Sequence, residues 1–252
     1  MHLLQRHPIP VTAWLRRSLV LTYALPRDVL DPLLPPGLTL DTYEGHGMLA
    51  IGLVQTEHLR PSILPAVCGR DFFLAGYRIF TRLATSAASL RGLRILRSDT
   101  DSPLMVRAGN LLTHYHYRLC RFHLDAEGAA ERWQIRTPRQ EADLDVTVHL
   151  ADEPAPLPAG SPFPNEKDAR RFAGPLPYTF DYEPETHSIV SIRGLRSNWN
   201  PLPVRVDVSR NTFLDREPFR GTQPILANAF YLRDVPYQWL RGVRIPLERS
   251  AA

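Results

Sequence analysis

The sequence predicts an α+β protein built mainly from antiparallel strands, which form a barrel-like sheet with a few short helices around it. About ten short runs of β-branched, aliphatic and aromatic residues are spread along the chain, whereas helical patterns are few and short. The chain has 252 residues, of which 44% are hydrophobic and 22% are charged, so it can bury a sizeable core. We expect residues 1–252 to form a single domain.

The first part of the chain predicts a strand, a short helix and a hairpin. Residues 18–23 are rich in β-formers and end before Pro26, which fits the first turn of a helix. Residues 27–34 place four aliphatic side chains on one helical face, and Pro35-Pro36-Gly37 ends that helix. Strands are expected next at 38–41 and 48–55.

The rest of the chain continues the sheet. Further strands are expected at 72–82, 93–97, 111–124, 131–136, 145–150, 178–182, 188–193 and 204–213. Residues 153–164 are rich in proline and predict a long loop inside the same domain, and Asn165 predicts the cap of a short helix through Phe172. Residues 224–240 carry apolar side chains at spaced positions, but Pro236 excludes an uninterrupted helix.

Composition limits the classes of partner. The formal net charge is +4, but the arginines are spread along the chain and form no basic cluster, so we expect no nucleic-acid partner. Cys68 and Cys120 are too few for a disulfide framework and indicate a reducing, cytoplasmic setting. Apolar runs such as 48–54 are far shorter than the roughly 18 residues of a membrane span, and we expect no membrane partner.

The run from Gly109 to Cys120 is the most distinctive local feature. If it forms a strand, its period of two places His114, His116 and Arg118 on one face and Tyr115 and Tyr117 on the other. A His-x-His pair near a cysteine suggests zinc, but Arg118 would repel a cation, so no metal is predicted. A sheet surface whose polar groups are satisfied by hydrogen bonds is the simpler interpretation.

Two other groups of charged residues have both structural and functional interpretations. Residues 97–101 contain Asp-x-Asp and lead to Arg107, but they lack the glycine and later glutamate of a calcium loop and favour a hairpin turn. Arg78 and Arg82 share one face of an apolar strand, where a buried arginine needs a carboxylate partner. We favour an ion pair within the protein, and binding of a substrate carboxylate is the alternative.

Signatures of dinucleotide, nucleoside-triphosphate, serine-hydrolase and metalloprotease sites are missing, and the sequence predicts no cofactor. The residues alone do not name a reaction.

Three stretches of the chain resemble one family. They are residues 19–24 followed by 29–38, residues 97–101 with 109–115, and residues 171–182. They resemble the uncharacterised YqjF-like family, which is grouped with acetoacetate-decarboxylase-like proteins. The resemblance covers most of the chain and implies a cone-shaped antiparallel β-barrel with peripheral helices around an internal pocket.

The resemblance does not extend to the decarboxylase chemistry. In the decarboxylases, Gly-Arg-Glu followed by Pro-Lys-Lys supplies a lysine that forms a Schiff base with the ketoacid. The best counterpart here is residues 109–111 followed by 114–117, which hold neither that lysine nor that glutamate. Lys167, the only lysine, lies far outside this run. Schiff-base catalysis is therefore not expected.

The resemblance implies a pocket that binds or processes a small carboxylate or carbonyl metabolite. An enzyme of this kind would have a lyase-like activity on a small organic acid without a catalytic lysine, and the alternative is a non-catalytic ligand-binding or interaction module. A homo-oligomer is left open. The catalytic candidates are His114, His116 and Tyr117, because imidazole titrates near neutrality. We expect the even-numbered face of this run, which carries both histidines, to point into the pocket. The substrate-binding candidates are Arg78, Arg107, Asn110 and Arg118.

Overall fold

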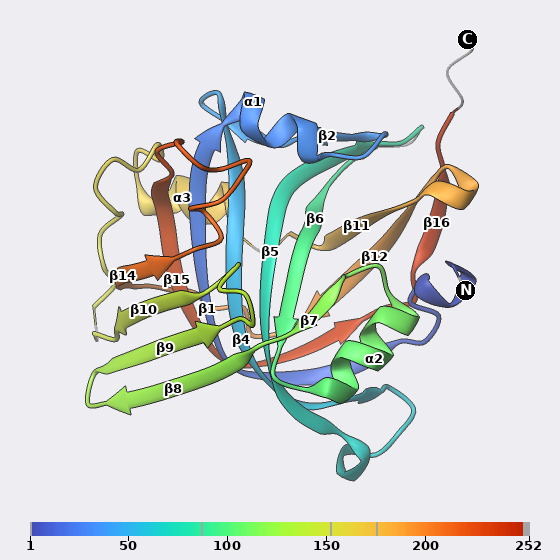
Figure 1. The fold of residues 1–252 in the computed structure, drawn as a ribbon, viewed down its shortest axis with the longest axis horizontal. Coiled ribbons are helices and arrows are strands. Elements are labelled where there is room, and N and C mark those ends of the chain that lie inside the picture. The colour runs from blue at the N-terminus through green and yellow to red at the C-terminus, as the bar shows by residue number, and fades with distance from the viewer. Residues whose placement is uncertain (1, 87, 152, 175, 249–252) are drawn as a thin grey trace.

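The computed structural model describes residues 2–86, 88–151, 153–174 and 176–248 (Figure 1). Its strands are β1 (Val11–Pro26), β2 (Leu38–Leu40), β3 (Thr42–Tyr43), β4 (His46–Pro61), β5 (Arg70–Ala84), β6 (Ser89–Thr100), β7 (Tyr117–Leu119), β8 (Arg121–Glu127), β9 (Ala130–Arg136), β10 (Leu144–His149), β11 (Tyr178–Glu183), β12 (Ser188–Arg196), β13 (Leu202–Pro203), β14 (Arg205–Asn211), β15 (Ile225–Trp239) and β16 (Val243–Pro246). Its α-helices are α1 (Arg27–Leu30), α2 (Pro103–Leu112) and α3 (Glu166–Phe172), and short 3-10 turns cover His2–Gln5, Asp31–Leu33, Ala66–Cys68 and Pro184–Thr186.

A 12-stranded sheet forms the body of the protein. Its main order is β13-β15-β1-β4-β5-β6-β11-β12-β16, and β12 also pairs with β15, so the sheet returns on itself. Three residue pairs make this closure, among them Arg196 with Tyr237. Pairing is antiparallel except for β6 with β7 and β6 with β11. The result is an irregular, curled sheet rather than a regular barrel, and the predicted α+β class with mainly antiparallel strands is confirmed.

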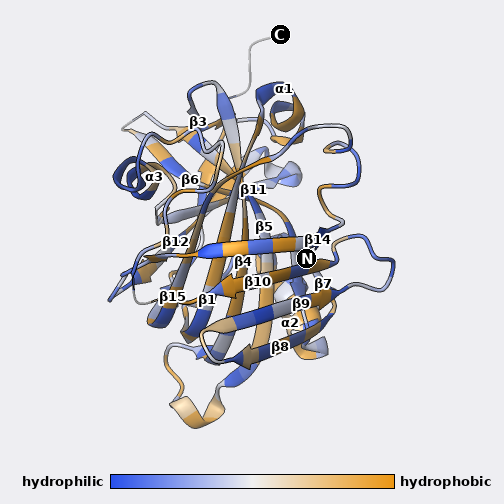
Figure 2. Ribbon diagram, turned by 90° about the vertical axis from the view of Figure 1, so that its left-hand side faces the viewer, coloured by the Kyte–Doolittle hydropathy of each residue, from blue (hydrophilic) through white to orange (hydrophobic). Residues whose placement is uncertain are grey.

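A second sheet, of order β14-β10-β9-β8, covers one face of the first. Figure 2 shows its strands running across those of β4 and β5. Alternate residues of β1, β4 and β5 point toward it and are fully buried, and they pack with Trp133 and Ile135 of β9 in the largest apolar cluster. The core of the protein therefore lies between the two sheets. The intervening residues of β1, β4 and β5 point to the opposite face, where the main sheet curls.

Residues 103–112 form helix α2, so the strand predicted over 111–124 is wrong at its start. The Ser102 hydroxyl accepts a hydrogen bond from the Met105 amide, and Pro103 occupies the first helical position, where it costs no backbone hydrogen bond. The strand begins only at Tyr117 and is interrupted before Arg121. The local alternation of histidine and tyrosine is thus confined mainly to the turn after the helix.

Other expectations are confirmed or corrected. Asn165 caps α3 as predicted, with its side chain accepting from the Asp168 amide at 2.9 Å, and residues 153–164 form an irregular connection. Residues 97–100 are the buried end of β6, not a hairpin turn, because Asp99 pairs with Arg97 inside the protein. Residues 225–239 form a long strand, whose Pro236 lies opposite Trp14. No helix of the described residues is long and apolar enough to cross a membrane.

Candidate functional site

The curled face of the main sheet encloses a cavity of about 150 Å³. One row of residues crosses four neighbouring strands and the start of β7 along its wall. In order of pairing, that row is Val20, Gly52, Gly76, Ser98 and Tyr117. Two glycines at the centre of the row carry no side chains, so they leave room above the sheet for another side chain to approach the backbone closely.

Arg78 reaches into the space that the glycines leave. A Cβ atom built on Gly76 would lie 2.7 Å from the Arg78 Nε, so the guanidinium lies directly over this glycine. The Nε atom is buried and has no hydrogen-bond partner within the described residues. Arg82, four residues along the same strand, instead bonds Asp41 at 2.7 Å. The predicted ion pair within the protein is therefore confirmed for Arg82, whereas Arg78 has no such carboxylate in the described structure.

A second arginine enters the cavity from the seam where β12 meets β15. The guanidinium carbon of Arg196 lies 4.7 Å from the ring centre of Trp199 and 5.9 Å from that of Tyr237. These aromatic faces hold the cation by its quadrupole attraction and fix its direction. Burial lowers the pKa of Arg196 from its usual value, but an arginine stays cationic at neutral pH.

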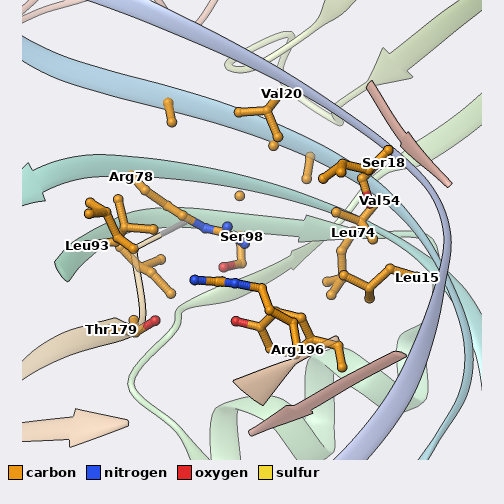
Figure 3. Close-up of a pocket in the computed structure, with 18 of the residues that line it drawn as sticks. Leu15, Ser18, Val20, Val54, Leu74, Arg78, Leu93, Ser98, Thr179 and Arg196 are labelled. Atoms are coloured by element: carbon orange, nitrogen blue, oxygen red, sulfur yellow. The ribbon is translucent and has the colours of Figure 1, made fainter. Parts of the chain in front are cut away.

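The cavity therefore concentrates positive charge. Figure 3 shows the side chains of Arg78, Ser98 and Arg196 pointing toward one another. The described residues around the cavity include no aspartate, glutamate, histidine, lysine or cysteine, and the remaining polar groups are mainly hydroxyls. Two half-buried guanidinium groups that face each other without a carboxylate are costly unless an anion neutralises them. The arrangement is suited to bind a carboxylate or another small anion through charge-assisted hydrogen bonds.

The tyrosines, not the histidines, face this cavity. Tyr115 and Tyr117 line it and are nearly fully buried, whereas His114 and His116 do not line it. This is contrary to the expectation that the even-numbered side chains point inward. His116 is exposed and adopts a left-handed backbone, at φ +53°, which breaks the strand alternation on which that expectation depended. Partial desolvation of the imidazole rings lowers the pKa of both histidines, and their predicted catalytic roles stay predictions.

The other predicted binding residues lie outside the cavity. Arg107 and Arg118 are exposed, on α2 and β7. The Asn110 side chain joins these two elements, because its Nδ2 donates to the Tyr117 carbonyl at 2.9 Å and its Oδ1 accepts from the Tyr117 amide at 2.7 Å. Asn110 is thus placed to position Tyr117 rather than to touch a ligand in the cavity.

A buried ion pair lies close to the cavity tyrosines. Asp181 of β11 is 1% exposed and pairs with Arg94 of β6, and burial raises the pKa of this carboxyl to about 7, against the opposing effect of Arg94. Lys167, the single lysine, is exposed on α3 and does not line the cavity. Within the described residues, no group of three or more histidine, cysteine, aspartate or glutamate side chains could hold a metal ion.

Sequence reasoning found Arg78 but missed Arg196, Gly52 and Gly76. A glycine inside a strand pattern signals a close approach of other atoms, so the glycines at 52 and 76 could have been singled out. Arg196 carries no such signal. Its position depends on the pairing of β12 with β15, which the local sequence does not reveal.

Comparison with solved structures assigns the fold. The chain is similar to acetoacetate decarboxylase from Legionella pneumophila, with a TM-score of 0.67, 11% identity and coverage of 94% of this chain and 88% of that one. It is also similar to an acetoacetate decarboxylase-like enzyme from Sphingomonas wittichii, with a TM-score of 0.62, 14% identity and coverage of 94% of this chain and 93% of that one. A third similar structure is the enduracididine biosynthesis enzyme MppR complexed with pyruvate, with a TM-score of 0.60, 11% identity and coverage of 94% of this chain and 90% of that one. The chain thus has the acetoacetate-decarboxylase-like fold.

The sequence also assigns the chain to a family. A family model named DUF2071 and described as an uncharacterised conserved protein matches residues 12–233, and the chain belongs to this family. A search of curated proteins found no match.

Proposed function

We propose that the cavity binds a small organic acid, with the ligand carboxylate or carbonyl between Arg78 and Arg196. The observation that carries the proposal is the convergence of two guanidinium groups where the described lining holds no acidic side chain. The structural relative MppR, which was determined with pyruvate, supports a ligand of this kind. A ligand carboxylate would accept a hydrogen bond from the unpartnered Nε of Arg78 and neutralise part of the positive charge of the two arginines.

Catalysis and simple binding make different demands on this cavity. The two arginines could stabilise negative charge that develops on a substrate, as a lyase-like step on an organic acid requires. A general base is harder to supply, because the described lining has hydroxyls and no carboxylate, imidazole or amine. That observation favours the second candidate, a non-catalytic ligand-binding module. A cytoplasmic location and the narrower likeness to YqjF-like proteins stay predictions.

Thermal unfolding and calorimetry with pyruvate and acetoacetate test the proposal. We expect both acids to raise the melting temperature of the full chain, because a ligand at 100 times its dissociation constant stabilises by about 2.7 kcal/mol. Pyruvamide, which lacks the negative charge, should have little effect. Arg78→Ala and Arg196→Ala should each weaken binding by about tenfold or more, because a charge-assisted hydrogen bond contributes roughly 1.5–3 kcal/mol.

His116→Ala and Arg107→Ala are the matched controls, because both side chains are exposed and lie outside the cavity. Equal loss of binding in a control and in Arg78→Ala would contradict the assignment of the site. Turnover of either acid, measured in the same samples, separates catalysis from binding.

Reductive trapping tests the absence of Schiff-base chemistry. A Schiff-base lysine needs a desolvated setting or a neighbouring cation that lowers its pKa, and Lys167 is exposed. Borohydride treatment with acetoacetate should therefore leave no adduct at Lys167, and Lys167→Ala should bind pyruvate normally. An adduct at Lys167, found by peptide mass spectrometry, would overturn this part of the proposal.

A further inference from the structure

A second hollow lies beside the arginine cavity and shares a wall with it. Four side chains line both spaces: Leu74, Tyr115, Tyr117 and Trp239. The second hollow measures about 400 Å³ and opens between the N-terminal segment, the ends of β4 and β5, and helix α2. We call this second hollow the α2 groove. These four residues form a boundary common to both spaces, so movement of their side chains could join the two.

The α2 groove is more apolar than the arginine cavity, whose wall also has many apolar side chains but holds Arg78 and Arg196. Its lining is mainly apolar and includes Ile9, Val11, Leu59, Phe72, Leu104 and Met105. Two of these remain in contact with solvent, because Ile9 is 45% and Leu104 is 58% exposed. The charged members Arg60 and Arg70 lie at the end of β4 and the start of β5. An apolar surface of this kind gains free energy when a hydrophobic group covers it.

The size of the arginine cavity limits what it can hold alone. A cavity of about 150 Å³ accommodates a group of roughly the size of benzene. An organic acid with a longer chain would fill it and would extend past the shared wall. Tyr115 is part of that wall, and its buried hydroxyl has no hydrogen-bond partner within the described residues, so a polar group on a ligand could accept from it.

We infer that the natural ligand is an amphipathic monocarboxylate, whose carboxylate lies between Arg78 and Arg196 and whose hydrocarbon chain extends into the α2 groove. This inference rests on the proposed function and narrows its ligand class from small polar acids to acids with an apolar chain. The charged end and the apolar end of such a ligand match the two adjoining spaces, and the four shared side chains are the place where the chain crosses.

Calorimetry with straight-chain saturated acids of four to twelve carbons, each below its micelle concentration, tests the inference on the full chain. Each buried methylene contributes up to about fourfold in affinity, so decanoate should bind about 100-fold or more tightly than butanoate. Leu104→Glu places a charge in the α2 groove and should remove most of this difference while butanoate binding changes by less than about twofold. Ala108→Phe, which fills the groove, should act in the same direction.

Leu111→Glu is the matched control, because Leu111 is an exposed leucine of the same helix that does not line the groove. Binding of all chain lengths with equal affinity would overturn the inference and leave the proposed function intact. Equal effects of Leu104→Glu and Leu111→Glu on decanoate would also overturn it. Failure of every acid to bind would overturn both proposals.

Sedimentation of the same variants identifies a competing occupant. Ile63 and Val67, both 89% exposed, lie in the loop that leads to the groove residue Cys68, so a second copy of the chain could cover this face. A self-association that Leu104→Glu abolishes, without any change in chain-length dependence, would assign the groove to a subunit contact and overturn the inference. A monomer with the expected dependence supports it.

Discussion

At the scale of single residues, the cavity shows how a missing side chain positions a charge. Gly52 and Gly76 are direct partners in neighbouring strands, yet they relate differently to Arg78. A Cβ on Gly76 would lie 2.7 Å from the Arg78 Nε, whereas a Cβ on Gly52 would lie 3.7 Å from a terminal nitrogen, which is ordinary contact. A side chain at position 76 would therefore clash with the guanidinium of Arg78, whereas one at position 52 would not.

This difference predicts the behaviour of two alanine variants. Gly76→Ala should fold, because the atoms it displaces belong to the end of a flexible side chain, but it should weaken pyruvate binding by about tenfold, a loss of roughly 1.4 kcal/mol. Gly52→Ala should bind pyruvate within about twofold of the parent chain. Calorimetry on both variants checks this, and equal effects would show that Gly76 has no special role in placing Arg78.

The two cavity arginines also differ in whether the sequence predicts their role. Arg78 could be singled out because a charge on an apolar strand is conspicuous, and its alternative role as a ligand-binding group remained open. Arg196 could not be found in this way. It joins the cavity only because β12 returns to β15, some forty residues along the chain, and no local pattern encodes that pairing.

At the scale of elements, α2 explains the main error of the sequence-based prediction. Residues 114–118 alternate in polarity as a strand would, and this pattern predicts a strand from residue 111 onward. Helix α2, however, continues through Leu112. The contrary signal was Ser102-Pro103 at the start of that segment, a cap followed by proline at the first helical position. The α3 cap and the proline-rich connection have clear local signals, and both predictions are confirmed.

The contact between α2 and β7 gives a stability prediction. Asn110→Ala removes both side-chain hydrogen bonds to the Tyr117 backbone and leaves that buried amide and carbonyl unpaired. We expect it to lower the free energy of unfolding by about 1–3 kcal/mol, measured by urea denaturation. Arg107→Ala, on the same helix but exposed, should change it by less than about 0.5 kcal/mol. Loss of pyruvate binding by Asn110→Ala without loss of stability would instead support direct ligand contact.

The N-terminal segment is held to β11 by an ion pair that gives a pH prediction. The Arg6 Nε donates to the Glu183 Oε2 at 2.8 Å, and hydrogen bonding to Arg6 lowers the pKa of Glu183 to about 2. Because the pKa in the unfolded chain is higher, near 4.5, the ionised carboxylate stabilises the fold above that value. This stabilisation is lost as the pH falls toward 2.

Urea denaturation as a function of pH measures this contribution. Arg6→Ala should lower the free energy of unfolding by about 2 kcal/mol at pH 6, after allowance for solvent screening at the partly exposed arginine. At pH 2 the variant and the parent chain should differ much less. A difference that stays constant across this range would show that Arg6 acts through packing rather than through the charge of Glu183.

At the scale of the whole molecule, alternating residues of the main sheet serve two roles, packing in the core and lining the cavity. One face packs on the second sheet and supplies the largest apolar cluster, and the other encloses the arginine cavity. The face that packs on the second sheet therefore holds the backbone of β4 and β5 in place for the face that lines the arginine cavity. A cavity that holds two arginines can persist here because the apolar cluster between the two sheets provides hydrophobic stabilisation of the fold.

Strand pairing across the proline-rich connection predicts that the chain behaves as one folding unit. Residues 153–164 are attached to the body, because the Ser161 hydroxyl donates to the Ala227 carbonyl at 2.7 Å and Phe163 is 3% exposed in an apolar cluster. Strands on either side of this connection pair with one another: β10 with β14, and β1 with β15. Neither half could keep these hydrogen bonds alone, and each would expose the apolar face that it now buries.

Limited proteolysis followed by gel filtration and denaturation checks this prediction. Cleavage beside the exposed residues Glu153 and Pro154 should leave the two fragments associated, because the severed chain keeps both interstrand ladders. The nicked protein should elute with the intact chain and unfold in one cooperative transition at lower urea, since cleavage adds chain entropy to the unfolded state. Fragments that separate without denaturant and each unfold cooperatively would show two independent domains, and the cavity, whose wall includes β1, β5 and β15, would then require both.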